Sequence, residues 1–159
     1  VFVMPLKGRL PNGGDSPTFI DKWDGYPGSR QRLAKTVTDA GLTNVVIATG
    51  DAHMNAVAEV PLHDEARGGP AFATEFLATS ISSNGDGGVF SSNVQRFLDA
   101  DNPFLKSADN LRGYHLHDIT PETWRADVKV MDQVQRKGGK LSTRASFVVE
   151  PHTPKLHEV

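Results

Sequence analysis

Between residues 29 and 40 apolar side chains recur at spacings of three and four. Because residues at this spacing share one face of a helix, the pattern predicts an α-helix from Arg30 to Ala40. Ser29 is a residue type that caps the start of helices, and Gly41 is one that ends them. We therefore expect one helix in the first third of the chain, bounded by these two residues.

Runs of consecutive apolar residues lie on either side of this helix and predict strands. Phe2–Leu6 precedes it, and Asn44–Thr49 follows it as a continuous β-branched run. Such a run is typical of a strand covered on both faces. A further short strand is expected over residues 54–60, so the first third has the order β-α-β.

The remainder of the chain alternates apolar segments with polar turns. Residues 71–81 are mostly apolar and lead into a polar, glycine-rich segment, 82–88, which predicts a loop or lid, and residues 93–100 predict a short helix. Later strands are expected over Tyr114–Ile119, Trp124–Val134 and Ala145–Glu150. Successive strands with short connections favour antiparallel pairing, so the predicted class is a layered α/β fold with antiparallel edge strands. A length of 159 residues predicts a single domain, 1–159.

The composition excludes several classes of function. Seventeen Lys and Arg stand against nineteen Asp and Glu, a formal charge of −2, so the chain has no strong signal for nucleic acid or for an anionic membrane. No apolar run approaches the length of a membrane span. The chain has no cysteine, so a metal ion would be held by His, Asp, Glu, Asn or backbone oxygen.

The strongest chemical signal is the segment Gly50-Asp51-Ala52-His53, directly after the predicted strand Asn44–Thr49. Ligands of α/β sheets bind beyond the carboxyl ends of strands. A carboxylate and an imidazole two residues apart, after a glycine that permits a sharp turn, can both bind one divalent or trivalent cation. The alternative is that Asp51 begins an ordinary turn and His53 is a surface residue.

Other candidates carry weaker signals. His115 and His117 would project from one face of a strand, either to chelate a metal or, more simply, on a solvent face. Residues 85–88, Gly-Asp-Gly-Gly, suggest a phosphate or calcium loop but lack the spacing of either known motif. Trp23 and Tyr26 either line a cleft or anchor a long loop. The serines near residue 80 lack the nucleophile-elbow motif, which argues against a serine hydrolase.

Several separated segments match one family in order and spacing. In the first third they are Lys22-Trp23-Asp24-Gly25-Tyr26-Pro27, Arg30-Gln31-Arg32-Leu33 and the run from Asn44 to His53. In the remainder they are Ala73-Thr74-Glu75-Phe76, Thr79-Ser80-Ile81-Ser82-Ser83, Asn102-Pro103, Arg112-Gly113-Tyr114 and Ile119-Thr120-Pro121-Glu122. Together they resemble the C-terminal part of the alkaline phosphatase D (PhoD-like) metallophosphatases over nearly the whole chain.

The resemblance implies part of a layered αββα sandwich with mixed and antiparallel strands and a multinuclear metal centre at the strand ends. It implies Asp51 and His53 as metal ligands, iron and calcium as the metals, and a phosphate ester as the substrate. It also implies a periplasmic or secreted protein. Metal ions in such a centre neutralise phosphate oxygens and activate a water molecule as the nucleophile.

Two departures from the family pattern change the expectation. Phe104 stands where the family commonly has a histidine, and the family's earlier metal ligands are absent. We therefore expect a fragment that is inactive alone and that associates with itself or with the remaining polypeptide. The alternatives are a non-catalytic binding or structural module on the same scaffold, or another metallophosphoesterase such as a nuclease or a phospholipase-like enzyme.

Overall fold

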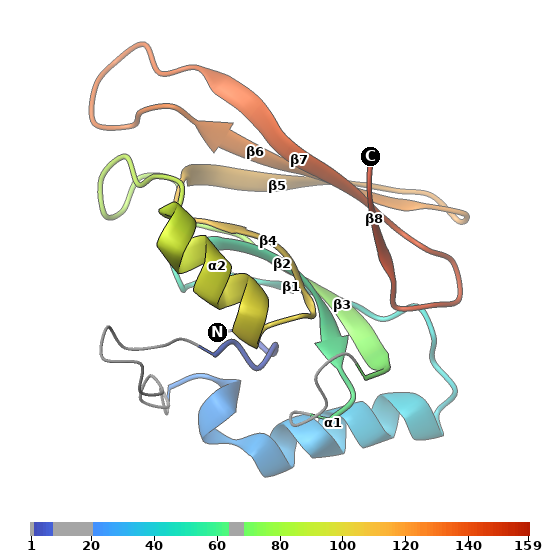
Figure 1. Cartoon of the computed structure of the whole chain (residues 1–159). Helices are drawn as coiled ribbons and strands as arrows, with labels where there is room; N and C mark the ends of the chain where they lie inside the picture. The colour runs from blue at the N-terminus through green and yellow to red at the C-terminus, as the bar shows by residue number, and fades with distance from the viewer. Residues whose placement is uncertain (1, 8–20, 64–68) are drawn as a thin grey trace.

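The computed structural model describes residues 2–7, 21–63 and 69–159. Within these residues two four-stranded β-sheets pack face to face, and two α-helices cover the outer face of the first sheet (Figure 1). The helices are α1 (Pro27–Asp39) and α2 (Ser92–Asp101), and a 3-10 turn, η1 (Trp23–Gly25), precedes α1. The predicted layered α/β class is confirmed, and the described residues form the layers α-β-β.

The two sheets come from consecutive parts of the chain. The first has the order β1-β3-β2-β4 and contains β1 (Val46–Thr49), β2 (Asn55–Pro61), β3 (Ala71–Leu77) and β4 (Leu105–Asp109). The second has the order β5-β6-β7-β8 and contains β5 (Arg112–Ile119), β6 (Trp124–Met131), β7 (Leu141–Val149) and β8 (Leu156–Glu158). β1 pairs with β3 in parallel and the other neighbours are antiparallel, so the first sheet is mixed and the second is antiparallel.

An apolar cluster fills the space between the sheets. Val57 and Phe76 come from the first sheet, and most of the other members come from β6 and β7. Along β6 the buried residues are Ala126, Val128 and Val130, and charged residues alternate with them. This period of two places one face of the strand in the core and the other outward.

The start of α1 differs from the prediction. The helix begins at Pro27 with Tyr26 as its N-cap, three residues before the expected first residue, Arg30. Proline at the first helical position has its φ angle already set for the helix and lacks an N–H that would otherwise be unsatisfied. Ser29 is therefore inside the helix, and the prediction that it caps the start was wrong.

The end of α1 lies where the sequence predicts it. Gly41 adopts a left-handed conformation with φ of 66°. Its N–H donates to the Thr38 carbonyl (3.0 Å), and the Leu42 N–H donates to the Val37 carbonyl (3.1 Å). This pair of bonds is the Schellman motif, which satisfies the last carbonyls of a helix.

Phe2–Leu6 does not form a strand, which corrects the prediction. The Val3 and Met4 N–H groups donate to the carboxylate of Glu75 on β3, at 2.8 and 2.7 Å. The Thr49 hydroxyl donates to the same carboxylate at 2.7 Å. A side chain therefore takes the donors that a strand would need, although the apolar side chains are buried as the pattern predicts. Burial raises the pKa of Glu75, against the lowering effect of these hydrogen bonds.

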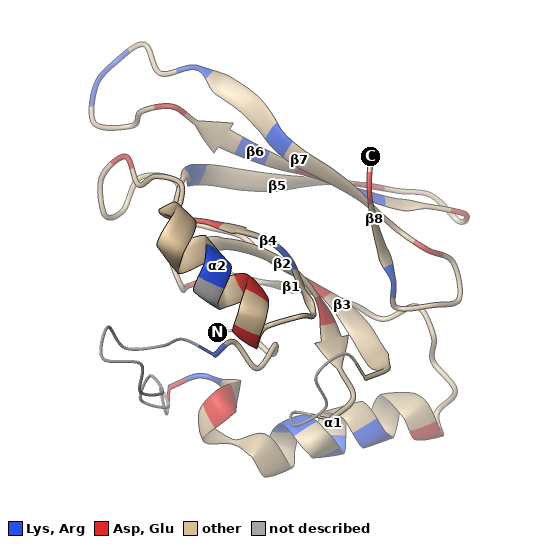
Figure 2. Cartoon of the chain, in the orientation of Figure 1, with Lys and Arg blue, Asp and Glu red and all other residues tan. Residues whose placement is uncertain are grey.

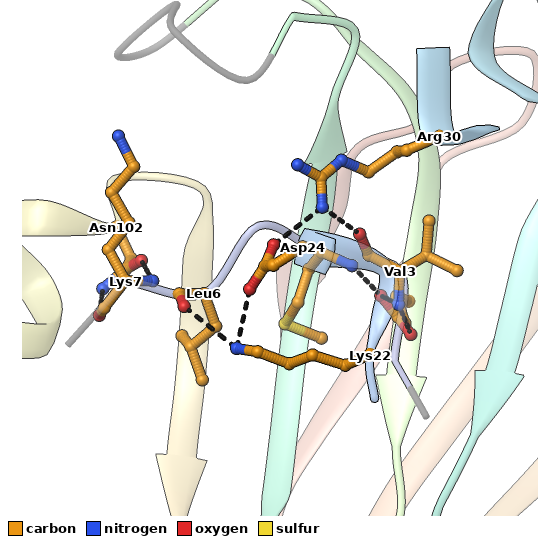
Figure 3. A network of polar contacts seen from close by, with 9 residues as sticks. Val3, Leu6, Lys7, Lys22, Asp24, Arg30 and Asn102 are labelled. Carbon is orange, nitrogen blue, oxygen red and sulfur yellow. Dashed lines mark hydrogen bonds and ion pairs between the residues drawn. The ribbon is translucent and has the colours of Figure 1, made fainter. Parts of the chain in front are cut away.

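A second set of polar contacts holds this N-terminal segment against the helical side (Figure 3). The buried Arg30 guanidinium pairs with Asp24 at 2.7 Å and donates to the Val3 carbonyl at 3.4 Å. The amide of Asn102, at the end of α2, accepts from the Lys7 N–H and donates to the Lys7 carbonyl, at 2.7 and 2.8 Å. The segment is thus fixed by side chains from both helical regions and from β3.

Several strand boundaries also differ from prediction. β1 was expected to be covered on both faces, but it is only partly buried and Ala48 is exposed. It lies at one edge of its sheet. The strands β4 and β8 were not predicted, β7 begins at Leu141 rather than Ala145, and β6 ends at Met131. These segments are short or have polar ends, so pairing with neighbouring strands, rather than local hydrophobic period, determines their extent.

Within the described residues no helix has both the length and the apolar character needed to cross a membrane. Figure 2 shows Lys and Arg interspersed with Asp and Glu over the helices and both sheets. This distribution agrees with the near-neutral charge of the sequence.

Candidate functional site

Asp51 and His53 lie in the turn that connects β1 to β2. The turn follows the carboxyl end of β1, as the sequence predicts. Asp51 has φ of 77° and His53 has φ of 52°, and Asp51 is exposed whereas His53 is partly buried. Left-handed backbone is costly for residues other than glycine and persists only where surrounding contacts impose it. The turn is therefore held in its shape by other parts of the fold.

Two of those contacts act directly on His53. Its ring atom Nδ1 lies 3.0 Å from Nδ2 of Asn84, in the loop after β3. Its backbone carbonyl accepts a hydrogen bond of 2.9 Å from Nη1 of Arg112, the first residue of β5. Ring and backbone are thus held from two different segments.

Arg112 connects the turn to the rest of this region. Its side chain is fully buried, with no exposed surface. Besides the His53 carbonyl, it donates to the Ser80 hydroxyl at 2.7 Å and contacts the carbonyl and side-chain oxygens of Asn110. A buried guanidinium needs such a set of acceptors, because an unpartnered buried charge is strongly unfavourable.

The loop after β3 approaches Arg112 closely enough to require glycine. A Cβ atom on Gly87 would lie 1.7 Å from the Asn110 carbonyl oxygen and 2.8 Å from the Arg112 guanidinium. Gly87 also has φ of 73°. The glycine-rich segment is therefore packed against the core at this point.

Asp51 and His53 offer some, but not all, of the ligand atoms that a metal ion needs. A carboxylate and a neutral imidazole are ligands for iron and other first-row cations, and a carboxylate also suits calcium. Across residues 2–7, 21–63 and 69–159, however, no group of three or more His, Asp or Glu side chains is arranged to hold a metal. Asp51 and His53 therefore fit as contributors to a larger ligand set.

His115 and His117 share one face of β5, as predicted, but this face packs between the sheets and is not a solvent face. Their rings pack edge-on against Phe76 between the sheets, with centroids 6.3 and 5.2 Å from that of Phe76. Nε2 of His115 lies 3.2 Å from Oδ1 of Asn55, and Nδ1 of His117 accepts from the Trp124 indole at 2.9 Å. Burial lowers the pKa of both histidines, that of His115 to about 4.

Other candidates have structural roles. The carboxylate of Asp86 accepts from the N–H groups of Val134 and Gln135, at 2.6 and 2.8 Å, and so ties the glycine-rich loop to the β6–β7 connection. Trp23 packs against an apolar cluster that includes Ala34 and Val37 of α1, which favours the anchoring role. Tyr26, in contrast, is 59% exposed.

Phe104 packs against the apolar cluster on the helical side of the first sheet. An aromatic hydrocarbon side chain in this position contributes packing and has no ligand atom. The sequence pattern does not identify Asn84 or Arg112 as contacts of the turn. The Arg112-Gly113-Tyr114 motif marks Arg112 in the sequence, but it does not indicate which groups the guanidinium binds.

The comparisons with known proteins agree with this architecture. A family model described as PhoD-like phosphatase matches residues 1–128. Alkaline phosphatase D of Bacillus subtilis (strain 168) is 36% identical over 145 residues, which cover 91% of this chain and 25% of that protein. A solved structure titled "Structure of PhoD" superposes with a TM-score of 0.88 at 31% identity, over 100% of this chain and 30% of the other.

A mixed sheet packed on an antiparallel sheet, with helices outside, defines the chain as a layered α/β sandwich protein. The chain belongs to the PhoD-like phosphatase family. The resemblance found in the sequence is thus confirmed. The chain spans 25 to 30% of the length of the relatives it matches.

Proposed function

We propose that this chain is part of a metal-dependent phosphoric-ester hydrolase, and that Asp51 and His53 supply two of its metal ligands. The observation that carries the proposal is the left-handed turn at the end of β1, held by buried Arg112, in a chain of the PhoD-like family. Side chains fixed by rigid surroundings make better ligands than mobile ones, because less freedom is lost on binding.

The roles of the two residues follow from their chemistry. A bound metal would polarise a phosphate ester and activate a water molecule. The Asp51 carboxylate would supply an anionic oxygen ligand, and His53 would supply a neutral nitrogen with a free lone pair. By family resemblance we propose iron and calcium as the metals, a phosphate monoester or diester as the substrate, and export to the periplasm or medium. The remaining ligands would come from a longer polypeptide that contains this chain.

The test compares Asp51→Asn and His53→Ala with Asp39→Asn and His63→Ala in that longer polypeptide. Asp39 and His63 are exposed and lie outside the turn, so their replacement controls for the loss of a carboxylate or an imidazole. We expect both turn variants to lose bound metal and hydrolysis of a generic phosphodiester, with the controls unchanged. Normal metal content and rate in both turn variants would refute the assignment.

A panel of substrates tested on the longer polypeptide separates the alternatives. A binding or structural module would show no hydrolysis even in the longer polypeptide with metal bound. A nuclease or a phospholipase-like enzyme would be inactive on simple esters and active on nucleic acid or phospholipid.

We also propose that the 159-residue chain alone is inactive and associates with itself or with the remaining polypeptide. Large apolar side chains on β5 and β7 support this proposal, since Leu116 is 51%, Ile119 is 56% and Leu141 is 50% exposed. Such groups are candidates for contact surfaces. Sedimentation velocity of the isolated chain tests it, and a monodisperse monomer would count against it.

A further inference from the structure

The side chain of Asn84 contacts the imidazole ring of His53 from a loop whose backbone is held by neighbouring contacts. The Asn84 amide lies 3.0 Å from Nδ1 of the imidazole. Asn84 and Gly85 have φ of 67° and 71°, so two successive left-handed residues shape the loop at this point. Asn84 is exposed, so its backbone shape is not imposed by burial of its own side chain.

Neighbouring contacts fix the loop on both sides of Asn84. The Ser80 hydroxyl, which accepts from Arg112, donates to the Ser83 carbonyl at 2.9 Å. A Cβ on Gly85 would lie 3.3 Å from the Gln135 side chain, so this part of the loop rests on the β6–β7 connection. The backbone of His53 is held by the same Arg112 at 2.9 Å. The amide and the ring are therefore set opposite each other before any ligand binds.

A neutral imidazole has one N–H and one nitrogen with a lone pair, and a metal ion binds only the latter. In metal sites the other nitrogen donates its proton to an acceptor, which fixes the tautomer and the ring orientation. An asparagine amide offers a donor at Nδ2 and an acceptor at Oδ1, and a half-turn of the amide exchanges them. Asn84 can therefore face Nδ1 of His53 with either group.

We propose that Asn84 is the positioning residue that determines which nitrogen of His53 is available to the metal. The inference rests on the proposed function. With Nδ2 toward the ring, as observed, Nδ1 accepts a hydrogen bond and Nε2 carries the proton, so neither nitrogen is available to a metal until the amide turns. With Oδ1 toward the ring, Nδ1 carries the proton and donates it to Asn84, which leaves Nε2 as the ligand. Between these states the imidazole loses a proton from Nε2 and gains one at Nδ1 from water, so its charge does not change.

The test uses Asn84→Ala, which removes the partner, and Asn84→Asp, which keeps an acceptor and no donor. Asn44→Ala is the matched control, because Asn44 is an exposed asparagine at the opposite end of β1. In the longer polypeptide, affinity for Zn²⁺ alone is measured by chelator competition. We expect a loss of about 10- to 100-fold for Asn84→Ala, and affinity equal to or tighter than wild type for Asn84→Asp. The control should match wild type.

A second readout is the position of the ring proton. Long-range ¹H–¹⁵N spectra of the longer polypeptide with Zn²⁺ should place the proton of His53 on Nδ1 in wild type and in Asn84→Asp. A merely structural role for Asn84 would change the unfolding midpoint, and it would not be rescued by aspartate. The inference is overturned if Asn84→Ala binds Zn²⁺ like wild type, if Asn84→Asp loses as much affinity as Asn84→Ala, or if the proton is on Nε2 in the loaded chain. If Asp51→Asn and His53→Ala also bind Zn²⁺ normally, the proposed function fails as well, which distinguishes the two failures.

Discussion

His115, which is partly buried between the sheets, predicts a specific loss of stability in mild acid. Nδ2 of Asn55 donates to Asp109 at 2.7 Å, so Oδ1 of Asn55 faces Nε2 of His115 and that nitrogen carries the proton. Nδ1 of His115 is buried without a hydrogen-bond partner among the described residues. A second proton would therefore have no acceptor. Burial lowers the pKa of His115 from 6.5 to about 4, and the nearby His117 contributes to the same direction.

The sign and the size follow from proton linkage. In the unfolded chain His115 takes up a proton near pH 6.5, whereas in the folded chain it remains neutral until about pH 4. Stability from this residue is thus complete above pH 6.5 and is lost as the pH falls toward 4. Each pH unit inside this window removes up to about 1.4 kcal/mol, so a change from pH 7 to pH 5 should cost about 2 kcal/mol.

Urea unfolding at pH 7 and pH 5 measures this loss. His115→Gln keeps an N–H for Asn55 and cannot be protonated, so its free energy of unfolding should fall by about 2 kcal/mol less than that of wild type between the two pH values. His117 remains in this variant and contributes its own acid loss, since burial also lowers its pKa. The control His63→Gln changes an exposed histidine and should lose as much as wild type. An equal loss in His115→Gln and wild type would refute the reasoning.

Three further predictions concern packing around the turn and the sheets. Arg112→Met leaves several buried acceptors without a donor and should lower the free energy of unfolding by more than about 3 kcal/mol, measured in urea. Gly113→Ala would place a Cβ 1.9 Å from the Lys129 carbonyl oxygen and should lower the free energy of unfolding by more than about 3 kcal/mol. Gly138→Ala has open space and a φ of 89°, so it should lower it by about 1 kcal/mol. Thermal unfolding measures both, and similar losses would contradict the prediction. Glu75→Ala removes the acceptor of the N-terminal segment, and hydrogen exchange should accelerate at the amides of Val3 and Met4 while remaining slow in β6.

Sequence patterns predict those elements that are held by residues close to them in the chain. The helix at residues 27–39 has the expected period, and its end is fixed by a glycine next to it in sequence. Phe2–Leu6 has a strand-like pattern, but its N–H groups bind Glu75, more than 70 residues away. No local pattern contains that partner, so the sequence predicts the burial of this segment and not its backbone shape.

The candidate site likewise contains residues that the sequence predicts and residues that it does not. Asp51 and His53 are visible in the sequence because they are adjacent to a predicted strand end. Arg112 and Asn84 are 59 and 31 residues from His53, and their contacts depend on how β5 and the loop after β3 meet the turn. A glycine next to an asparagine indicates a turn, but it does not indicate what the amide binds.

The division of the two sheets along the chain has a consequence for how the protein folds. β5 to β8 pair in sequence order, so every contact of that sheet links neighbouring strands. The first sheet instead needs β3 inserted between β1 and β2, and the N-terminal segment reaches partners as far as 95 residues away. Folding rates fall as contacting residues lie further apart in sequence. We therefore expect the last third of the chain to form its hairpins early, and the N-terminal segment, together with the turn that carries Asp51 and His53, to acquire its final shape late.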